Sequence, residues 1–177
     1  MNHSPYRVKD MTHIALMVVL ITVCSWISIP APVPFTLQTF AVFFALLFLG
    51  GHHGMTAICV YLIMGAIGLP VFTGFQGGMG ILAGAYGGYI GGFLVTAILF
   101  RLMAKDASQI RSVAVLVLGL AACYACGTIW FMNCYSAESE LALPAALTMC
   151  VFPFILPDLG KLALAVFLVK RVKKFLR

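Results

Sequence analysis

The chain has 177 residues, of which 63% are apolar and only 9% are charged, with a formal net charge of +6. An ordinary soluble domain is about 25% charged, so this composition excludes a water-soluble globule and indicates a lipid bilayer as the main solvent. The basic residues gather at chain ends and turns without interleaved aromatics, and we therefore expect no nucleic-acid partner.

The first predicted membrane helix covers about residues 11–29. It follows Arg7 and Lys9, which is also the order found in a signal peptide. The run is longer than a signal core, and prolines crowd the possible cleavage site, so we predict that the helix is retained. Three prolines between residues 30 and 34 then end it, because proline lacks the N–H group and disfavours helix in the residue before it.

The second apolar run covers about residues 36–49. As a helix it would be about 21 Å long, which is shorter than the roughly 30 Å hydrocarbon core. We predict that a loop inside a protein-lined cavity completes this crossing, because irregular backbone is tolerated at membrane depth only in that setting. A tight turn at residues 50–54 leads to a third predicted helix over about residues 55–72.

The next segment, residues 73–92, contains nine glycines. Glycine permits positive φ and close approach of the backbone to a ligand or a neighbouring helix. The G-x-x-x-G spacing of Gly80, Gly84 and Gly88 is equally typical of a helix-packing face. We predict a glycine-rich loop followed by a fourth helix over about residues 81–103.

The fifth predicted helix covers about residues 112–133, and a sixth covers about residues 146–169. Cys123 and Cys126 form a C-x-x-C motif, which in a soluble protein hints at redox chemistry or a zinc site. Inside an apolar span these thiols are interpreted as packing residues. No H-E-x-x-H motif occurs, and we predict neither a metal site nor a cofactor.

Six helices place ten of the eleven Lys and Arg residues on one side of the membrane. By the positive-inside rule that side is the cytoplasm. The sequence therefore predicts an all-α integral membrane protein of the plasma membrane, a single domain over residues 1–177 with six transmembrane helices and both termini cytoplasmic. We find no internal duplication of the kind that builds many secondary transporters.

The eleventh cation, Lys161, lies inside the last predicted helix. Counted back from Lys170, Lys161 is about 14 Å deep and Asp158 about 18 Å deep, and their spacing places them on one helix face. An isolated charge at this depth costs at least about 2.5 to 3.5 kcal/mol, so the pair predicts a functional site. The alternative is an ion pair that only holds the bundle together.

Other polar and aromatic side chains converge on the same outer half of the predicted bundle. The polar ones are Gln38, Gln76, Tyr89 and Asn133, and the aromatic ones are Trp26, Phe35, Phe72, Phe75 and Tyr86. An apolar site with a few convergent polar groups is typical of small-molecule binding. The charges are too few for an ion channel, and no phosphate-binding G-x-x-x-x-G-K-[ST] motif occurs. We therefore predict a non-enzymatic binding protein that draws any ATP energy from another chain.

Three stretches resemble the BioY family, the biotin-specific substrate-binding components of energy-coupling-factor (ECF) vitamin transporters. They are SWISIPAPVPFTLQTFAV (25–42), GAIGLPVFTGFQGGMGILAGAYGGYIGGF (65–93) and LPDLGKLALA (156–165). The resemblance implies six helices and high-affinity capture of biotin from outside, with biotin as transported ligand rather than cofactor. It also implies association with a membrane coupling protein of the EcfT type and two cytoplasmic ATPases.

The resemblance also assigns roles to individual residues. Asp158 and Lys161 correspond to the polar ligand pair of the family, and the loop from Phe35 to Gln38 to its lid. Tyr89 and the Gly77–Gly78 loop fall in its glycine-rich binding block.

Two departures from the family pattern stand out. The usual G-P-T-G-G-Y-[LI] reads GAYGGYI at residues 84–90, so Tyr86 reshapes or closes the pocket. The helix-one face for the coupling protein pairs Ala15 with Val19 rather than two small residues, which predicts a looser docking contact or another face.

Two alternatives remain at this stage. The chain could capture another vitamin, such as thiamin or riboflavin, and competition binding separates these ligands. It could also be a proton-coupled or redox membrane protein that uses Asp158 or the Cys123–Cys126 pair.

Overall fold

The computed structural model describes residues 8–30, 34–105, 107–135 and 143–175. Arg7, Asp106, Glu138, Glu140 and Arg177 lie outside the described residues. In chain order the elements are α1 (Val8–Trp26), β1 (Ser28–Ile29), β2 (Phe35–Thr36), α2 (Gln38–Ala66), the 3₁₀ turn η1 (Thr73–Phe75), α3 (Met79–Ala83), α4 (Gly87–Met103), α5 (Gln109–Tyr135), α6 (Leu143–Cys150) and α7 (Phe152–Phe175). Apart from one short hairpin the described elements are helical, as predicted.

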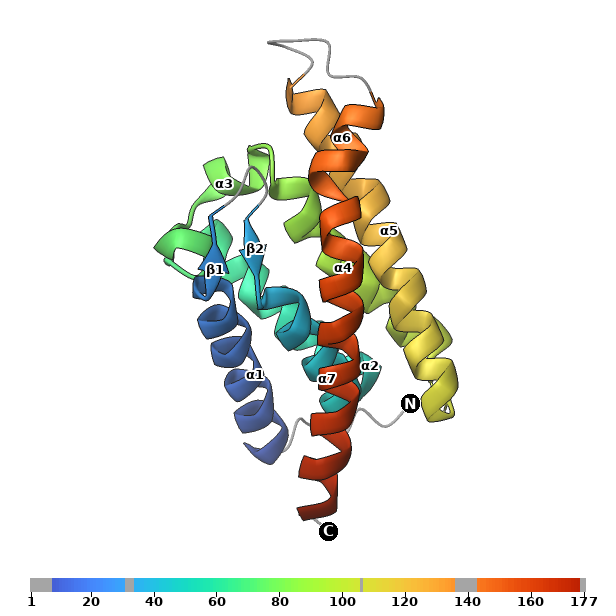
Figure 1. Ribbon diagram of the computed structural model, residues 1–177. Helices are drawn as coiled ribbons and strands as arrows, with labels where there is room; N and C mark the ends of the chain where they lie inside the picture. Colours follow the sequence, from blue (N-terminus) through green and yellow to red (C-terminus); the bar gives the residue numbers. More distant parts are fainter. Residues whose placement is uncertain (1–7, 31–33, 106, 136–142, 176–177) are drawn as a thin grey trace.

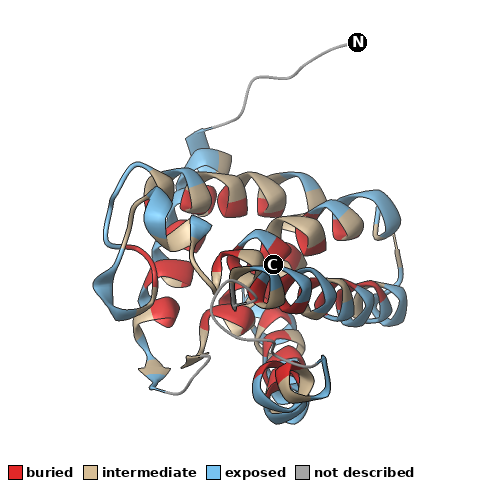
Figure 2. Ribbon diagram, turned by 90° about the horizontal axis from the view of Figure 1, so that it is seen from above, coloured by how far each residue is buried: buried red, intermediate tan, exposed pale blue. Residues whose placement is uncertain are grey.

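The long helices lie roughly along one common axis. The starts of α1 and α5 and the ends of α4 and α7 lie together at one end of the bundle (Figure 1). Viewed along this axis, the buried residues face inward and the exposed ones outward (Figure 2). Many outward residues are large and apolar, for example Ile129, Leu156 and Phe167. Within the described chain four helical segments are long and apolar enough to cross a membrane, and α4 is a shorter apolar helix. The predicted membrane character is therefore confirmed.

Helix α2 is two antiparallel helices joined by a sharp reversal at Gly50. Its φ of 80° and ψ of 174° lie outside the helical region, and a positive φ favours glycine. Gly54 packs against Leu46, and the Gln38 amide Nε2 donates to the Tyr61 hydroxyl at 2.8 Å. The predicted break between the second and third helices is therefore present.

The predicted bounds of the third helix need correction. The turn occupies one residue rather than 50–54, and the helix ends at Ala66 rather than at residue 72. The reasons are Gly68, whose φ is 100°, and Pro70, which has no N–H group to donate.

A two-stranded antiparallel hairpin connects α1 with α2. Ser28 pairs with Thr36, and Ile29 pairs with Phe35. The Lys161 ammonium of α7 donates to the Thr36 carbonyl at 2.6 Å, so α2 begins beside the middle of α7 rather than at the end of the bundle. The predicted second helix is short because this non-helical hairpin takes the place of its outer part.

The predicted fourth helix over residues 81–103 is wrong in its first turn. Helix α3 ends at Ala83, and the chain is extended at Gly84, whose ψ is 179°. The Trp130 indole of α5 donates to the Gly84 carbonyl at 2.9 Å. This tertiary bond satisfies a backbone group that an isolated glycine-rich helix would satisfy internally.

Helix α4 then packs closely along α5. A Cβ atom added at Gly88 would clash with the Trp130 Cβ, and one at Gly92 would lie 2.6 Å from the Cys123 sulfur. Helix packing through small residues occurs as predicted, but at Gly88 and Gly92 rather than at Gly80 and Gly84.

The predicted sixth helix over residues 146–169 consists of α6 and α7, which meet at Val151. Pro153 lies in the first turn of α7, where its missing N–H breaks no helical bond. Helix α5 contains the predicted 112–133 run and extends beyond it at both ends.

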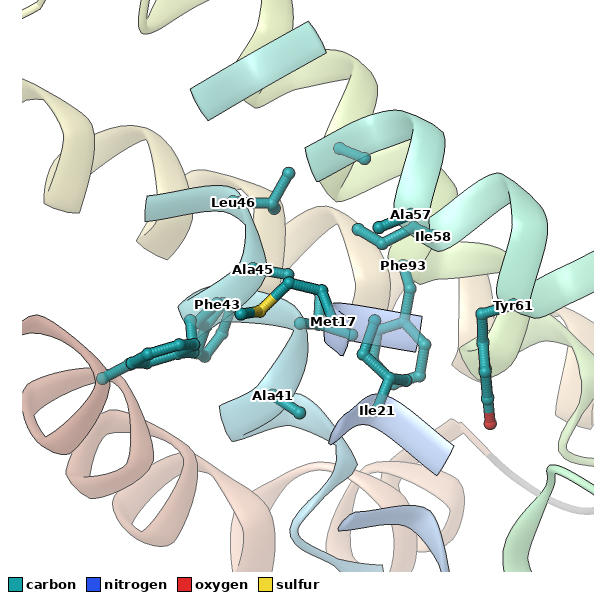
Figure 3. Packing of buried hydrophobic residues seen from close by; sticks show 14 of the residues in the cluster. Met17, Ile21, Ala41, Phe43, Ala45, Leu46, Ala57, Ile58, Tyr61 and Phe93 are labelled. Carbon is teal, nitrogen blue, oxygen red and sulfur yellow. The ribbon is translucent and has the colours of Figure 1, made fainter. Parts of the chain in front are cut away.

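Buried side chains of α1, both halves of α2, α4, α5 and α7 form the core of the bundle. Figure 3 shows Met17 and Ile21 of α1 among Ala41, Ala45 and Ala57 of α2, with Phe93 of α4 beside Ile21. The core therefore centres on the α2 hairpin, which contacts α1, α4 and α7.

Candidate ligand-binding site

The described residues line a cavity of about 410 Å³ between the β1–β2 hairpin, the start of α2, the glycine-rich loop and helices α4 to α7. This volume is typical of small-molecule sites. The wall is mostly apolar and is formed by Phe72, Ile81, Ile90, Phe93, Leu120 and Phe154, among others. Polar side chains such as Gln38, Gln76 and Tyr89 also line it, and two further ones carry charge.

The charged groups are Asp158 and Lys161, one turn apart on α7. The Lys161 Nζ lies 2.7 Å from the Asp158 Oδ1, and the Tyr124 hydroxyl of α5 donates to the Asp158 Oδ2 at 2.6 Å. The side chain of Asp158 is only 5% exposed and that of Lys161 10%. The charges neutralise each other, and each carboxylate oxygen accepts a hydrogen bond. These interactions offset the free-energy cost of removing the pair from water.

The same lysine joins the hairpin to α7. In addition to its bond to the Thr36 carbonyl, the Lys161 Nζ lies 4.8 Å from the centre of the Phe35 ring. That ring stacks on Phe154 of α7, with 4.7 Å between the ring centres. The hairpin is therefore held against α7 by one hydrogen bond, one cation–π contact and one aromatic stack.

Two further groups of hydrogen bonds border the cavity. The Tyr89 hydroxyl of α4 and the Thr128 hydroxyl of α5 lie 3.1 Å apart. The Tyr61 hydroxyl, which accepts from Gln38, donates to the Val71 carbonyl at 3.1 Å, and the Ser25 hydroxyl donates to the same carbonyl at 2.6 Å. Helices α1 and α2 thereby fix the start of the glycine-rich loop.

The structure brings most of the predicted site residues together. Those that line the cavity are Gln38, Phe72, Gln76, Tyr86, Tyr89, Asp158 and Lys161. Phe35 contacts the ion pair from the hairpin.

Three predicted residues lie apart from the cavity lining. Gly77 packs against the Leu69 carbonyl, and the Gly78 N–H donates to the Gly65 carbonyl at 2.7 Å, so both shape the loop. Asn133 is exposed on α5. It follows the buried Phe131 by two residues, a turn of about 200° around the helix, which directs it away from the interior.

Sequence reasoning missed Tyr124, although it lies in the middle of an apolar helix. Tyrosine in membrane proteins favours the interfaces, so a phenol at mid-span indicates a buried polar partner. The C-x-x-C thiols are separate: Cys123 is buried at the cavity wall, and Cys126 is exposed. Among the described residues no group of three or more His, Cys, Asp or Glu side chains could hold a metal ion.

Comparisons with known proteins agree with this geometry. The model of the BioY family matches residues 1–177. The chain is 39% identical over 168 residues to the biotin transporter BioY of Thermotoga maritima, covering 94% of this chain and 96% of that one. It is 36% identical to a probable biotin transporter BioY of Pyrococcus horikoshii, covering 94% and 98%. A crystal structure of the S-component for biotin from an ECF-type ABC transporter superposes with a TM-score of 0.80 at 28% identity, covering 94% of this chain and 92% of that one.

Proposed function

Because this chain belongs to the BioY family, we propose that it captures biotin with high affinity from outside the cell and transports it as the substrate-binding component of an ECF-type transporter. The observation that carries the proposal is the neutralised Asp158–Lys161 pair in the wall of a largely apolar cavity. Biotin has a rigid bicyclic body for the apolar wall and polar groups for the pair. The chain acts as a binding and transport protein, not as an enzyme.

The charges favour one orientation of biotin. A ring urea is neutral and offers both N–H donors and a carbonyl acceptor, so it matches Asp158 and Lys161 at the same time. The carboxylate of biotin would meet the repulsion of Asp158 at close range. We therefore place the ureido ring at the pair and the carboxylate toward the hairpin and the glycine-rich loop, near Gln76.

The proposed membrane topology has six crossings. Each half of α2 supplies one crossing, and α1, α4 and α5 supply one each. Helices α6 and α7 together supply the sixth. Arg101 lies in the last turn of α4, and Lys173 and Lys174 lie in the last turn of α7, at the end of the bundle where α1 and α5 begin (Figure 1). By the positive-inside rule this end is cytoplasmic, together with both termini.

The proposed partners are a coupling protein of the EcfT type in the membrane and two cytoplasmic ATPases. The sequence has no phosphate-binding G-x-x-x-x-G-K-[ST] motif, and the superposed S-component comes from an ECF-type ABC transporter. Co-purification of this chain with a coupling protein and ATPases tests this part. Capture of biotin by the isolated chain does not depend on it.

The direct test is equilibrium binding of biotin to the detergent-purified chain after removal of any vitamin that copurifies. We expect nanomolar affinity, competition by desthiobiotin and by biotin methyl ester, and none by thiamin or riboflavin. Competition by the ester follows from the proposed orientation, because the ester keeps the ureido ring. A folded sample that binds thiamin or riboflavin instead would refute the proposed substrate.

A further inference from the structure

The hydroxyl of Tyr124 on α5 contacts a charged group, the carboxylate of Asp158. Its side chain is half-buried at the cavity wall, and its hydroxyl lies 2.6 Å from the Asp158 Oδ2. Because Asp158 is paired with Lys161 and therefore ionised, the phenol must be the donor. A hydrogen bond to an ionised acceptor is about twice as strong as a hydrogen bond between two neutral groups.

The carboxylate of Asp158 is fixed by two donors from different elements. Lys161, one turn away on α7, holds Oδ1 at 2.7 Å, and Tyr124 on α5 holds Oδ2. The terminal torsion of an aspartate is broad, so the lysine alone leaves the plane of the carboxylate free to rotate about that contact. The second donor on α5 removes this freedom, and one lone pair on each oxygen remains for a further partner.

We propose that Tyr124 is a positioning residue of the binding site. Its hydroxyl orients the Asp158 carboxylate toward the cavity, so that Asp158 can accept from the N–H groups of the ligand. Tyr124 thereby raises affinity for ligands that carry such donors without donating to them itself. The assignment of biotin as that ligand rests on the proposed function above.

The test is a double-mutant cycle in the detergent-purified full chain, with Tyr124→Phe, Asp158→Asn and the combined variant. We expect Tyr124→Phe alone to weaken biotin binding about tenfold, as the loss of a hydrogen bond to a charged group would. In the Asp158→Asn background the same change should alter affinity less than about twofold, since the hydroxyl acts through the carboxylate. An equal loss in both backgrounds, or unchanged affinity in the parent, would overturn the proposal.

Thr96→Val is the matched control for a general loss of packing against α5. The Thr96 hydroxyl is buried and donates to the Gly119 carbonyl of α5 at 2.9 Å, but it is not part of the cavity wall. We expect this variant to lower thermal stability and to leave the affinity for biotin unchanged. A loss of affinity as large as that of Tyr124→Phe would mean that any hydroxyl at the α5 contact matters, and would count against the proposal.

An infrared readout without ligand separates this proposal from the proposed function. In protein labelled with ¹³C-aspartate, the carboxylate band that disappears in Asp158→Asn should shift in Tyr124→Phe and stay in place in Thr96→Val. If the parent chain does not bind biotin, the proposed substrate fails, while the infrared shift still decides whether Tyr124 orients Asp158. An unshifted band overturns the positioning role whatever the ligand is.

Discussion

Removing one member of the ion pair should damage the fold as well as the site. Lys161→Met keeps the length of the side chain but leaves Asp158, whose side chain is 5% exposed, with the Tyr124 hydroxyl as its remaining side-chain donor among the described residues. Breaking a buried ion pair in this way costs about 3 to 5 kcal/mol. The variant also loses the hydrogen bond from the Lys161 ammonium to the Thr36 carbonyl and the contact of that ammonium with the Phe35 ring. We therefore expect a lower unfolding temperature and a less firmly held hairpin.

Removing both charges should separate stability from binding. In the double variant Lys161→Met plus Asp158→Asn no charge is left unpaired, and replacing a buried pair by neutral groups is often close to neutral for stability. Binding should not recover, because each hydrogen bond to a charged group contributes about 1.5 to 3 kcal/mol. That range corresponds to a loss of about 10 to 150-fold in affinity for each contact with the ligand.

Two measurements check this reasoning on the same samples: thermal unfolding in detergent without ligand, and equilibrium binding of biotin. The expected order of stability is parent, then double variant, then Lys161→Met, whereas both variants lose high-affinity binding. A double variant as unstable as the single one would refute the unpaired-charge argument. Parent-like affinity in Lys161→Met would refute the role of the lysine in the site.

Three further predictions concern packing, the hairpin and the thiols. Gly88→Ala should lower the unfolding temperature because its Cβ would meet Trp130, while Gly91→Ala, which has open space around it, should not; equal effects would contradict the close helix contact. Phe35→Ala should release bound biotin several-fold faster in a chase experiment, because the hairpin loses its stack and its cation–π contact; an unchanged rate would argue against the hairpin as a lid. Replacing Cys123 and Cys126 together by alanine should leave the ratio of biotin uptake to biotin binding unchanged, and reduced uptake with intact binding would favour the redox alternative.

The apolar runs predicted the long helices well because lipid-facing and core residues are both apolar, so α1 and α5 stand out in the sequence. The start of α4 was mispredicted because the break at Gly84 depends on the Trp130 indole, a partner that lies far away in the chain. The β1–β2 hairpin was expected only as a loop, since two-residue strands beside prolines carry no periodic signal.

The site residues were also predictable where their partners are close in the sequence and were missed where the partners are far apart in the chain. Asp158 and Lys161 were predictable because spacing on one helix suffices to bring them together. Tyr124 was missed because its partner lies 34 positions along the chain on another helix. Asn133 was mispredicted because closeness to the end of a helix says nothing about which face a side chain occupies.

The reversal at Gly50 also bears on how the chain enters the membrane. The half of α2 before Gly50 is only about 18 Å long at 1.5 Å per residue, which is too short to span the hydrocarbon core by itself. We expect this half to leave the insertion machinery together with the half that follows, as one preformed hairpin. A substitution at Gly50 that prevents the reversal would then reduce the amount of protein that the ribosome and translocon insert into the membrane. This loss would come before any effect on the stability of the folded bundle.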